Sequence, residues 1–459
     1  MLEKTGLKDR EFLRSLVRLG LPIAFQNLLV SSLSVVDTVM VGRLGEVDIS
    51  AVGMASQLAM LINMFMFGIT SGASVFFSQY WGAGNVRMIR RAFGFAMTLS
   101  LTVATVFFVL VYAFPATAMS VYTNDADVIR HGAEYLSIAA FSYIPGALNI
   151  LFGSLLRSTE KPALPMVASA FSVVVNAFLN YALIFGKFGL PEMGVRGAAI
   201  ATVVSSVLSV VITVVVSLIT KNILISPLKE IFCFEKRFSA NYLRIAMPVF
   251  INEVVWSLGV TGYNMVFGRL GTANYSALTI TMTIQNLFFV FFIGLCTCCQ
   301  VLVGKSVGAG LIEKAKQTAR RFMYLTPMLG IITGLLMILV RKPLVSLFSI
   351  TPQAATTAGL LLLIYGIESS TRYIPYIGVV GIFRAGGDTK HGMFIDLFSL
   401  WCIGLPLTAI AALVFKLDFV VCVIIMVASE DIIKLILTIG WFRKYKWIMP
   451  VDTFAGSET

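Results

Sequence analysis

Long uninterrupted runs of apolar residues dominate this chain. Residues 93–112 and 198–220 are two examples, and each run is at least 20 residues long. A helix rises 1.5 Å per residue, so such a run crosses a hydrocarbon core of roughly 30 Å. Only helices and closed barrels satisfy their backbone hydrogen bonds in lipid, and these runs lack the alternation of barrel strands. The pattern predicts an all-α membrane protein.

About twelve spans can be counted along the chain. They begin near residues 15, 50, 92, 131, 163, 194, 240, 276, 319, 354, 394 and 418. The composition agrees with this count, because 58% of the residues are hydrophobic and only 13% are charged. Soluble domains are about 25% charged.

The net charge of +12 is explained by where the basic residues lie. If the N-terminus is cytoplasmic, the cytoplasmic segments hold 25 Lys and Arg and the opposite side holds eight. The positive-inside rule then places both termini in the cytoplasm. We therefore expect a multi-pass protein of the inner or plasma membrane, and no nucleic-acid partner.

The chain contains an internal repeat. At an offset of 226 residues the halves match in glycine and arginine at turns, which chance matches between apolar segments do not produce. The matched positions are Pro22 with Pro248, 42–45 with 268–271, 82–84 with 308–310 and, after a slip of one residue, Arg157 with Arg384. Six spans per copy keep both copies in one orientation, as in two-lobed transporters. We expect an N-lobe at 1–220, a cytoplasmic linker at 221–239, a C-lobe at 240–441 and a cytoplasmic tail at 442–459.

Several motifs occur in a specific order. They are Pro22 with Asp37 fifteen residues later, Val-Gly-Arg-Leu-Gly at 41–45, Gly-Ala-Gly at 82–84, Leu156-Arg157, Asn176 and Asn180, and Phe-Arg-Ala-Gly-Gly-Asp-Thr at 383–389. Together they resemble the multidrug and toxic compound extrusion (MATE) family over essentially the whole chain. The resemblance implies twelve transmembrane helices in two six-helix bundles. It also implies export of organic, often cationic, compounds in exchange for Na⁺ or H⁺.

By the same resemblance, four residues build a cation site in the N-lobe. Asp37 is the acid of the first helix, and Tyr135, Asn176 and Asn180 fall at positions that contribute to this site in relatives. Archaeal-type relatives have an Asp at the position of Asn180, so the site here carries one charge fewer. Na⁺ is one candidate ion for Asp37, Asn176 and Asn180.

Asp37 also stands out on physical grounds, because a carboxylate inside the membrane is costly unless it is paired or hydrated. The residues three and four positions away are not basic: they are Leu33, Ser34, Met40 and Val41. A low dielectric disfavours the charged form, so this acid can bind and release a proton. It can instead give an oxygen to Na⁺, together with the amides of Asn176 and Asn180 on one helix face. The competing interpretation is a structural aspartate near the outer interface, since Arg43 follows.

Glu253 is the main candidate in the C-lobe. The C-lobe acids of the NorM branch of the family would fall at Trp256 and Tyr373, so that site is not matched here. Glu253 shares roughly one helix face with Asn264. It can bind a cation or a cationic substrate, or serve as a structural carboxylate near the inner interface. Gln285 and Asn286 on the next helix are either polar lining or packing residues.

Two further pairs of charges lie in the C-lobe spans. Glu368 with Arg372 and Glu430 with Lys434 are spaced four residues apart, with the acid first, which is the favourable order for an ion pair. Self-neutralised pairs favour a structural role. Asp396 and Asp431 have no such partner and can line the C-lobe. Because the repeat partner of Asp37 is Tyr263 and not an acid, we expect the coupling chemistry mainly in the N-lobe.

The chain lacks motifs for a cofactor or for catalysis. The glycines at 82–84 are not followed by a Walker lysine, and two histidines are too few for the usual zinc spacings beside the cysteines at 296, 298 and 299. We expect no cofactor and no enzyme activity, so an ion gradient must drive transport. The expected partners are small organic molecules, Na⁺ or H⁺ and the lipid bilayer, and we expect a monomer. The rival functions are a flippase of lipid-linked saccharide precursors, which favours a strongly cationic cavity, and a passive channel.

Overall fold

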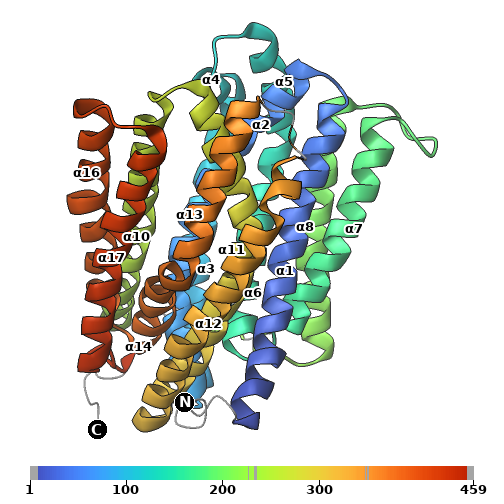
Figure 1. Cartoon of the computed structure of the whole chain (residues 1–459). Helices are drawn as coiled ribbons and strands as arrows, with labels where there is room; N and C mark the ends of the chain where they lie inside the picture. The colour runs from blue at the N-terminus through green and yellow to red at the C-terminus, as the bar shows by residue number, and fades with distance from the viewer. Residues whose placement is uncertain (1–8, 226, 232–234, 347, 349–350, 452–459) are drawn as a thin grey trace. The chain divides into compact units, whose positions relative to one another are not determined.

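The structure is a computed structural model that describes residues 9–225, 227–231, 235–346, 348 and 351–451 (Figure 1). Within these residues the elements are helical, and an isolated bridge joins Gly387 to Ile448. The prediction of an all-α protein is confirmed.

The first half of the described chain forms eight helices. They are α1 (Arg10–Gly42), α2 (Glu46–Gly82), α3 (Val86–Ala113), α4 (Pro115–Ser120), α5 (Ala126–Ala139), α6 (Tyr143–Ser158), α7 (Ala163–Ile184) and α8 (Gly194–Ile219). A short 3₁₀ turn, η1 (Ala140–Ser142), joins α5 to α6, so the two form one long rod.

The second half begins with the short helix α9 (Leu228–Ile231). It continues with α10 (Lys236–Gly268), α11 (Thr272–Gly308), α12 (Ile312–Val345), α13 (Pro352–Tyr376), α14 (Arg384–Gly386), α15 (Thr389–Leu397), α16 (Leu405–Ala409) and α17 (Phe419–Lys444). Three π-helical segments continue these helices without a break, and they are η2 (Ile377–Phe383), η3 (Phe398–Gly404) and η4 (Ile410–Val414). The sequence pattern did not predict these wider turns.

Ten helical rods of the described chain are long and apolar enough to cross a membrane. The two other long helices, α13 and α17, carry charged residues in their interiors and complete the expected twelve. Each of the twelve predicted spans has an observed helix that begins within seven residues of the predicted start. Most of these helices are longer than the apolar runs, because polar residues at their ends are also helical.

The chain divides into two compact units. Unit 1 contains the described residues of 1–24, 78–84 and 240–459, and unit 2 contains 25–77 and 85–239. Helices α1 and α2 therefore contribute to both units, and the boundary in α1 lies two residues after Pro22. The lobes expected from the repeat differ from these units at 1–24 and 78–84, and they stay a prediction.

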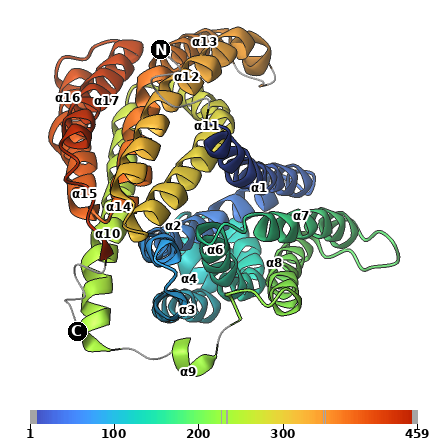
Figure 2. The same cartoon turned by 90° about the horizontal axis from the view of Figure 1, so that it is seen from below.

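Neighbouring helices pack along their lengths within each unit. Figure 2, which views the helices from one end, shows α7 beside α8 in unit 2, and α16 beside α17 in unit 1. One apolar core of unit 1 contains Cys296, Cys298, Cys299, Phe322 and Trp447, all of them fully or almost fully buried. The thiols of Cys296 and Cys299 lie against Gly381 of η2, as small packing residues do. Cys233 lies outside the described residues.

Two glycines that are equivalent in the repeat permit a close helix crossing within unit 1. A Cβ atom on Gly82 would overlap the carbonyl oxygen of Lys305, and a Cβ atom on Gly308 would overlap the carbonyl oxygen of Gln79. Lys305 and Gly308 follow Gln79 and Gly82 by the same 226 residues. The contact is therefore reciprocal, as expected for two copies related by a twofold axis.

This crossing predicts that Gly308→Ala destabilises the protein by about 1–3 kcal/mol, because the added methyl group overpacks a backbone contact. Thermal unfolding of the purified protein in detergent should show a lower midpoint. Gly440→Ala in α17 is the matched control, because its Cβ would meet no atom within 4 Å. Equal midpoints for Gly308→Ala and the wild type would contradict the close crossing.

Candidate functional site

A hydrogen-bonded network in unit 2 joins three of the residues singled out in the sequence. Asn180 on α7 donates from Nδ2 to Oδ1 of Asp37 on α1 at 2.5 Å, and to Oδ1 of Asn176 at 2.9 Å. Both asparagines are about 1% exposed, and Asp37 is half-buried. The spacing of four residues on α7 brings the two amides together, as the sequence predicted.

Helix α8 supplies the rest of this network. Asn176 donates from Nδ2 to the hydroxyl of Ser205 at 3.2 Å, and Ser205 in turn donates to the carbonyl oxygen of Thr202. We call Asp37, Asn180, Asn176 and Ser205 the Asp37 network. Ser205 was not found from the sequence, because a serine in an apolar helix gives no signal without knowledge of its neighbours.

The amide of Asn180 occupies the place where two oxygens converge. Its Nδ2 lies between Oδ1 of Asp37 and Oδ1 of Asn176, whereas its own Oδ1 is buried without a hydrogen-bond partner in the described part of the chain. A buried acceptor without a partner is unfavourable. Rotation of this amide by half a turn would present its oxygen beside the other two. Three oxygens around one point suit a small monovalent cation, and the carboxylate alone suits a proton.

Tyr135 lies on α5 beside the Asp37 network. It packs against the apolar cluster of Val41, Ile184 and Ala198, and its hydroxyl is within hydrogen-bonding reach of Thr202. The structure thus brings together all four residues that the resemblance assigned to the N-lobe site.

Glu253 in unit 1 is not an isolated acid. Its Oε1 lies 2.7 Å from Nη2 of Arg384, and the Arg384 side chain is only 3% exposed. Arg384 begins α14 directly after the π-helical η2. A buried pair with this geometry is strongly held, because either partner alone would leave an uncompensated charge. The sequence identified both residues but did not pair them, since they lie far apart in the chain.

The remaining polar candidates of unit 1 differ in burial. Gln285 is buried on α11, its neighbour Asn286 is exposed, and Asn264 on α10 is half-buried. The helix periodicity separates Gln285 from Asn286, so the two do not line one surface.

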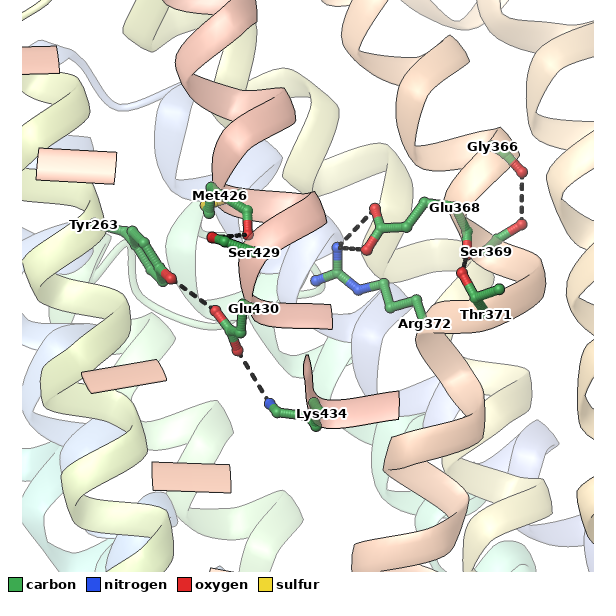
Figure 3. A network of polar contacts seen from close by, with 10 residues as sticks. All are labelled: Tyr263, Gly366, Glu368, Ser369, Thr371, Arg372, Met426, Ser429, Glu430 and Lys434. Atoms are coloured by element: carbon green, nitrogen blue, oxygen red, sulfur yellow. Dashed lines mark hydrogen bonds and ion pairs between the residues drawn. The ribbon is translucent and has the colours of Figure 1, made fainter. Parts of the chain in front are cut away.

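The two pairs spaced four residues apart do form ion pairs (Figure 3). Nη1 of Arg372 lies 3.4 Å from Oε1 of Glu368, and Nζ of Lys434 lies 3.0 Å from Oε1 of Glu430. Neither pair stands alone. Asp431 lies within hydrogen-bonding reach of Glu368, and Asp396 lies 3.3 Å from Lys434. Each pair is therefore a cluster with one more acid than base, which the local spacing did not reveal.

The described residues contain no group of three or more His, Cys, Asp or Glu side chains able to hold a metal ion. A cation in the Asp37 network would therefore rest on one carboxylate and on neutral oxygens. Such a ligand set suits a weakly bound, exchangeable monovalent ion rather than a structural divalent one.

The MatE family model matches this chain twice, at residues 22–182 and 248–410. The two matches begin 226 residues apart, at Pro22 and Pro248, which agrees with the internal repeat. Together they cover more than half of the chain.

Similar curated proteins extend over nearly the whole chain. A probable multidrug resistance protein NorM of Thermotoga maritima is 26% identical over 438 residues, covering 95% of this chain and 93% of that protein. The multidrug resistance protein MdtK of Photorhabdus laumondii is 25% identical and covers 86% of each chain. An uncharacterized transporter of Bacillus subtilis, YisQ, is 25% identical and covers 89% of each.

Solved structures share the fold. A MATE crystal structure in the bent conformation has a TM-score of 0.85 at 16% identity and covers 98% of each chain. The bent form of the Vibrio cholerae MATE transporter VcmN has a TM-score of 0.85 at 18% identity, covering 97% of this chain and 98% of that one. The chain therefore belongs to the MatE family, the multidrug and toxic compound extrusion transporters that its motifs resemble.

Proposed function

We propose that this protein is a secondary active antiporter that exports organic, often cationic, compounds in exchange for Na⁺ or H⁺. The observation that carries the proposal is the Asp37 network. Asp37 receives a hydrogen bond from a neutral amide, and no basic residue of the described chain pairs with it. A carboxylate that amides hold but do not neutralise can exchange one cation for another.

The names of the relatives support the class of substrate. NorM of Thermotoga maritima and MdtK of Photorhabdus laumondii are both named multidrug resistance proteins, and both align with most of this chain. The acid excess in unit 1 also favours cationic compounds. It disfavours the flippase alternative, which would need a cationic surface for a pyrophosphate group.

The internal repeat supports alternating access. Two lobes with the same orientation can rock about a shared axis and open a central site to one side at a time. We propose that the protein works as a monomer in the inner or plasma membrane, with both termini in the cytoplasm. It needs no cofactor, because the ion gradient supplies the energy.

Replacement of Asp37 by Asn should abolish export, because the amide cannot carry the exchangeable charge. In a drug-sensitive host, the initial rate of ethidium efflux is expected to fall roughly tenfold or more. Asp127→Asn is the matched control, since Asp127 is an exposed aspartate 3.2 Å from Arg130. The amount of each protein in the membrane is measured alongside. Normal efflux by Asp37→Asn would refute the role of Asp37.

Purified protein in proteoliposomes identifies the coupling ion. An imposed Na⁺ gradient or an imposed pH gradient should drive ethidium movement in the wild type, and neither should do so in Asp37→Asn. Ethidium movement that follows its own gradient only, whichever ion gradient is imposed, would instead indicate a passive channel.

A further inference from the structure

A second polar network runs between helices inside unit 1. Asn252 on α10 donates from Nδ2 to Oδ2 of Asp396 on α15 at 3.1 Å, and Asp396 Oδ1 lies 3.3 Å from Nζ of Lys434 on α17. Lys434 lies 3.0 Å from Oε1 of Glu430, whose Oε2 accepts a hydrogen bond from the hydroxyl of Tyr263 at 2.8 Å (Figure 3). We call these five residues the Lys434 network.

The Lys434 network contains two carboxylates and one ammonium group. The side chains of Asp396, Lys434 and Glu430 are 11–14% exposed, so all three charges are largely removed from water. With both acids ionised, the network carries one uncompensated negative charge inside the membrane. A charge in this position is unfavourable unless a cation or a proton balances it.

The groups around this network do not balance it. Arg384 on α14 interacts electrostatically with Asp396, but its direct partner is Glu253 of α10 at 2.7 Å, and this pair is neutral by itself. Asp431 lies on the same helix as Lys434 and interacts with Glu368 and Arg372, a cluster that also has one more acid than base. The neighbouring groups therefore supply no positive charge that balances the Lys434 network.

The N-terminal repeat shows which side chains suffice for packing at the positions equivalent to Asn252 and Asp396. With the one-residue slip of the later loops, Ser169 is equivalent to Asp396, and Gln26 is equivalent to Asn252. Gln26 donates from Nε2 to the hydroxyl of Ser169 at 3.0 Å, so the same two helices of that repeat are bridged by neutral groups. The bridge between these helices therefore does not require a charge.

The last helices of the two repeats, α8 and α17, differ in a similar way. The only charged residue of α8 is Arg196 in its first turn, whereas α17 carries Glu430, Asp431 and Lys434 in its interior. The last helix of the first repeat therefore packs without charged residues in its interior, so packing alone does not require the charges of α17.

Two local features indicate that the Lys434 network is poised to exchange a ligand. Asn252 is 3% exposed, and its amide nitrogen donates to Asp396. The oxygen of the same amide has no hydrogen-bond partner among the described residues. Asp396 also lies two residues before the π-helical η3. Such wider turns frequently occur at functional sites.

We propose that the Lys434 network is a second proton-exchange site, in which one proton at Asp396 and the positive charge of an organic substrate replace each other. The proposal rests on the antiport function proposed above. It involves neither Trp256 nor Tyr373, the positions where the resemblance would place C-lobe acids.

The exchange keeps the charge balanced at each step. When a proton binds a carboxylate oxygen of Asp396, Lys434 keeps Glu430 as its partner and the network is neutral. When the proton leaves for water, Lys434 holds both carboxylates and one negative charge remains. A cationic substrate near the network then replaces the lost positive charge. Because Lys434 neutralises one of the two carboxylates, a single proton is enough to bring the charge of the network to zero.

Infrared difference spectroscopy of the purified full-length protein tests this proposal. Spectra recorded between acidic and alkaline pH show the C=O stretching bands of carboxyl groups that titrate. Asp396→Asn is expected to lose one such band relative to the wild type, and ethidium added at acidic pH is expected to remove the same band from the wild type. Ser169→Ala, at the equivalent neutral position, should keep every band.

A second variant covers the case in which Asp396→Asn does not fold. Glu430→Gln also brings the charge of the network to zero, with Lys434 and Asp396 left as a pair, and should remove the same titrating band. The proposal is overturned if the variants keep all the bands of the wild type, or if ethidium leaves the Asp396 band intact. Asp37→Asn should remove a different band, so failure at Asp37 and failure at Asp396 are told apart.

Discussion

The structure depends on how a membrane protein accommodates charge that lipid does not solvate. In unit 1 the buried charges lie in pairs and clusters, in which Arg384 binds Glu253 and Lys434 binds two carboxylates. In unit 2, Asp37 accepts a hydrogen bond from the amide of Asn180 instead of pairing with a basic residue. A balanced pair such as Glu253–Arg384 removes a charge from chemistry. A carboxylate that is held by a neutral amide, or that outnumbers the bases around it, stays available. The proposed coupling roles follow from this difference.

Much of the fold could be predicted because membranes impose simple rules. The length of the apolar runs determined the number of helices, and the matched glycines and arginines revealed the repeat. The Asp37 site was also accessible, because Asn176 and Asn180 lie on one helix face and the motif order resembles a known family. Periodicity within one helix, however, cannot show that Asn176 continues to Ser205 on α8.

The rest of the site depends on contacts between helices that are distant in sequence. Glu368–Arg372 and Glu430–Lys434 looked self-neutralised, because only their own helices were considered. Asp396 and Asp431 join these pairs from positions that the local spacing cannot reveal. The expectation that the coupling chemistry lies mainly in the N-lobe rests on Tyr263 as the repeat partner of Asp37, and it stays a prediction. A comparison of the two copies offers a further signal, since the last helix of the first copy has no charged residue in its interior, whereas that of the second copy has Glu430, Asp431 and Lys434.

We propose that the coupling ion and the substrate compete for the negative charge of Asp37. Equilibrium binding of ethidium to the purified protein, followed by fluorescence over a range of pH and Na⁺ concentration, measures this competition. Ethidium should bind the wild type more weakly as either the H⁺ or the Na⁺ concentration rises, and Asp37→Asn should lose this dependence. An affinity of the wild type that neither ion changes would rule out competition at Asp37.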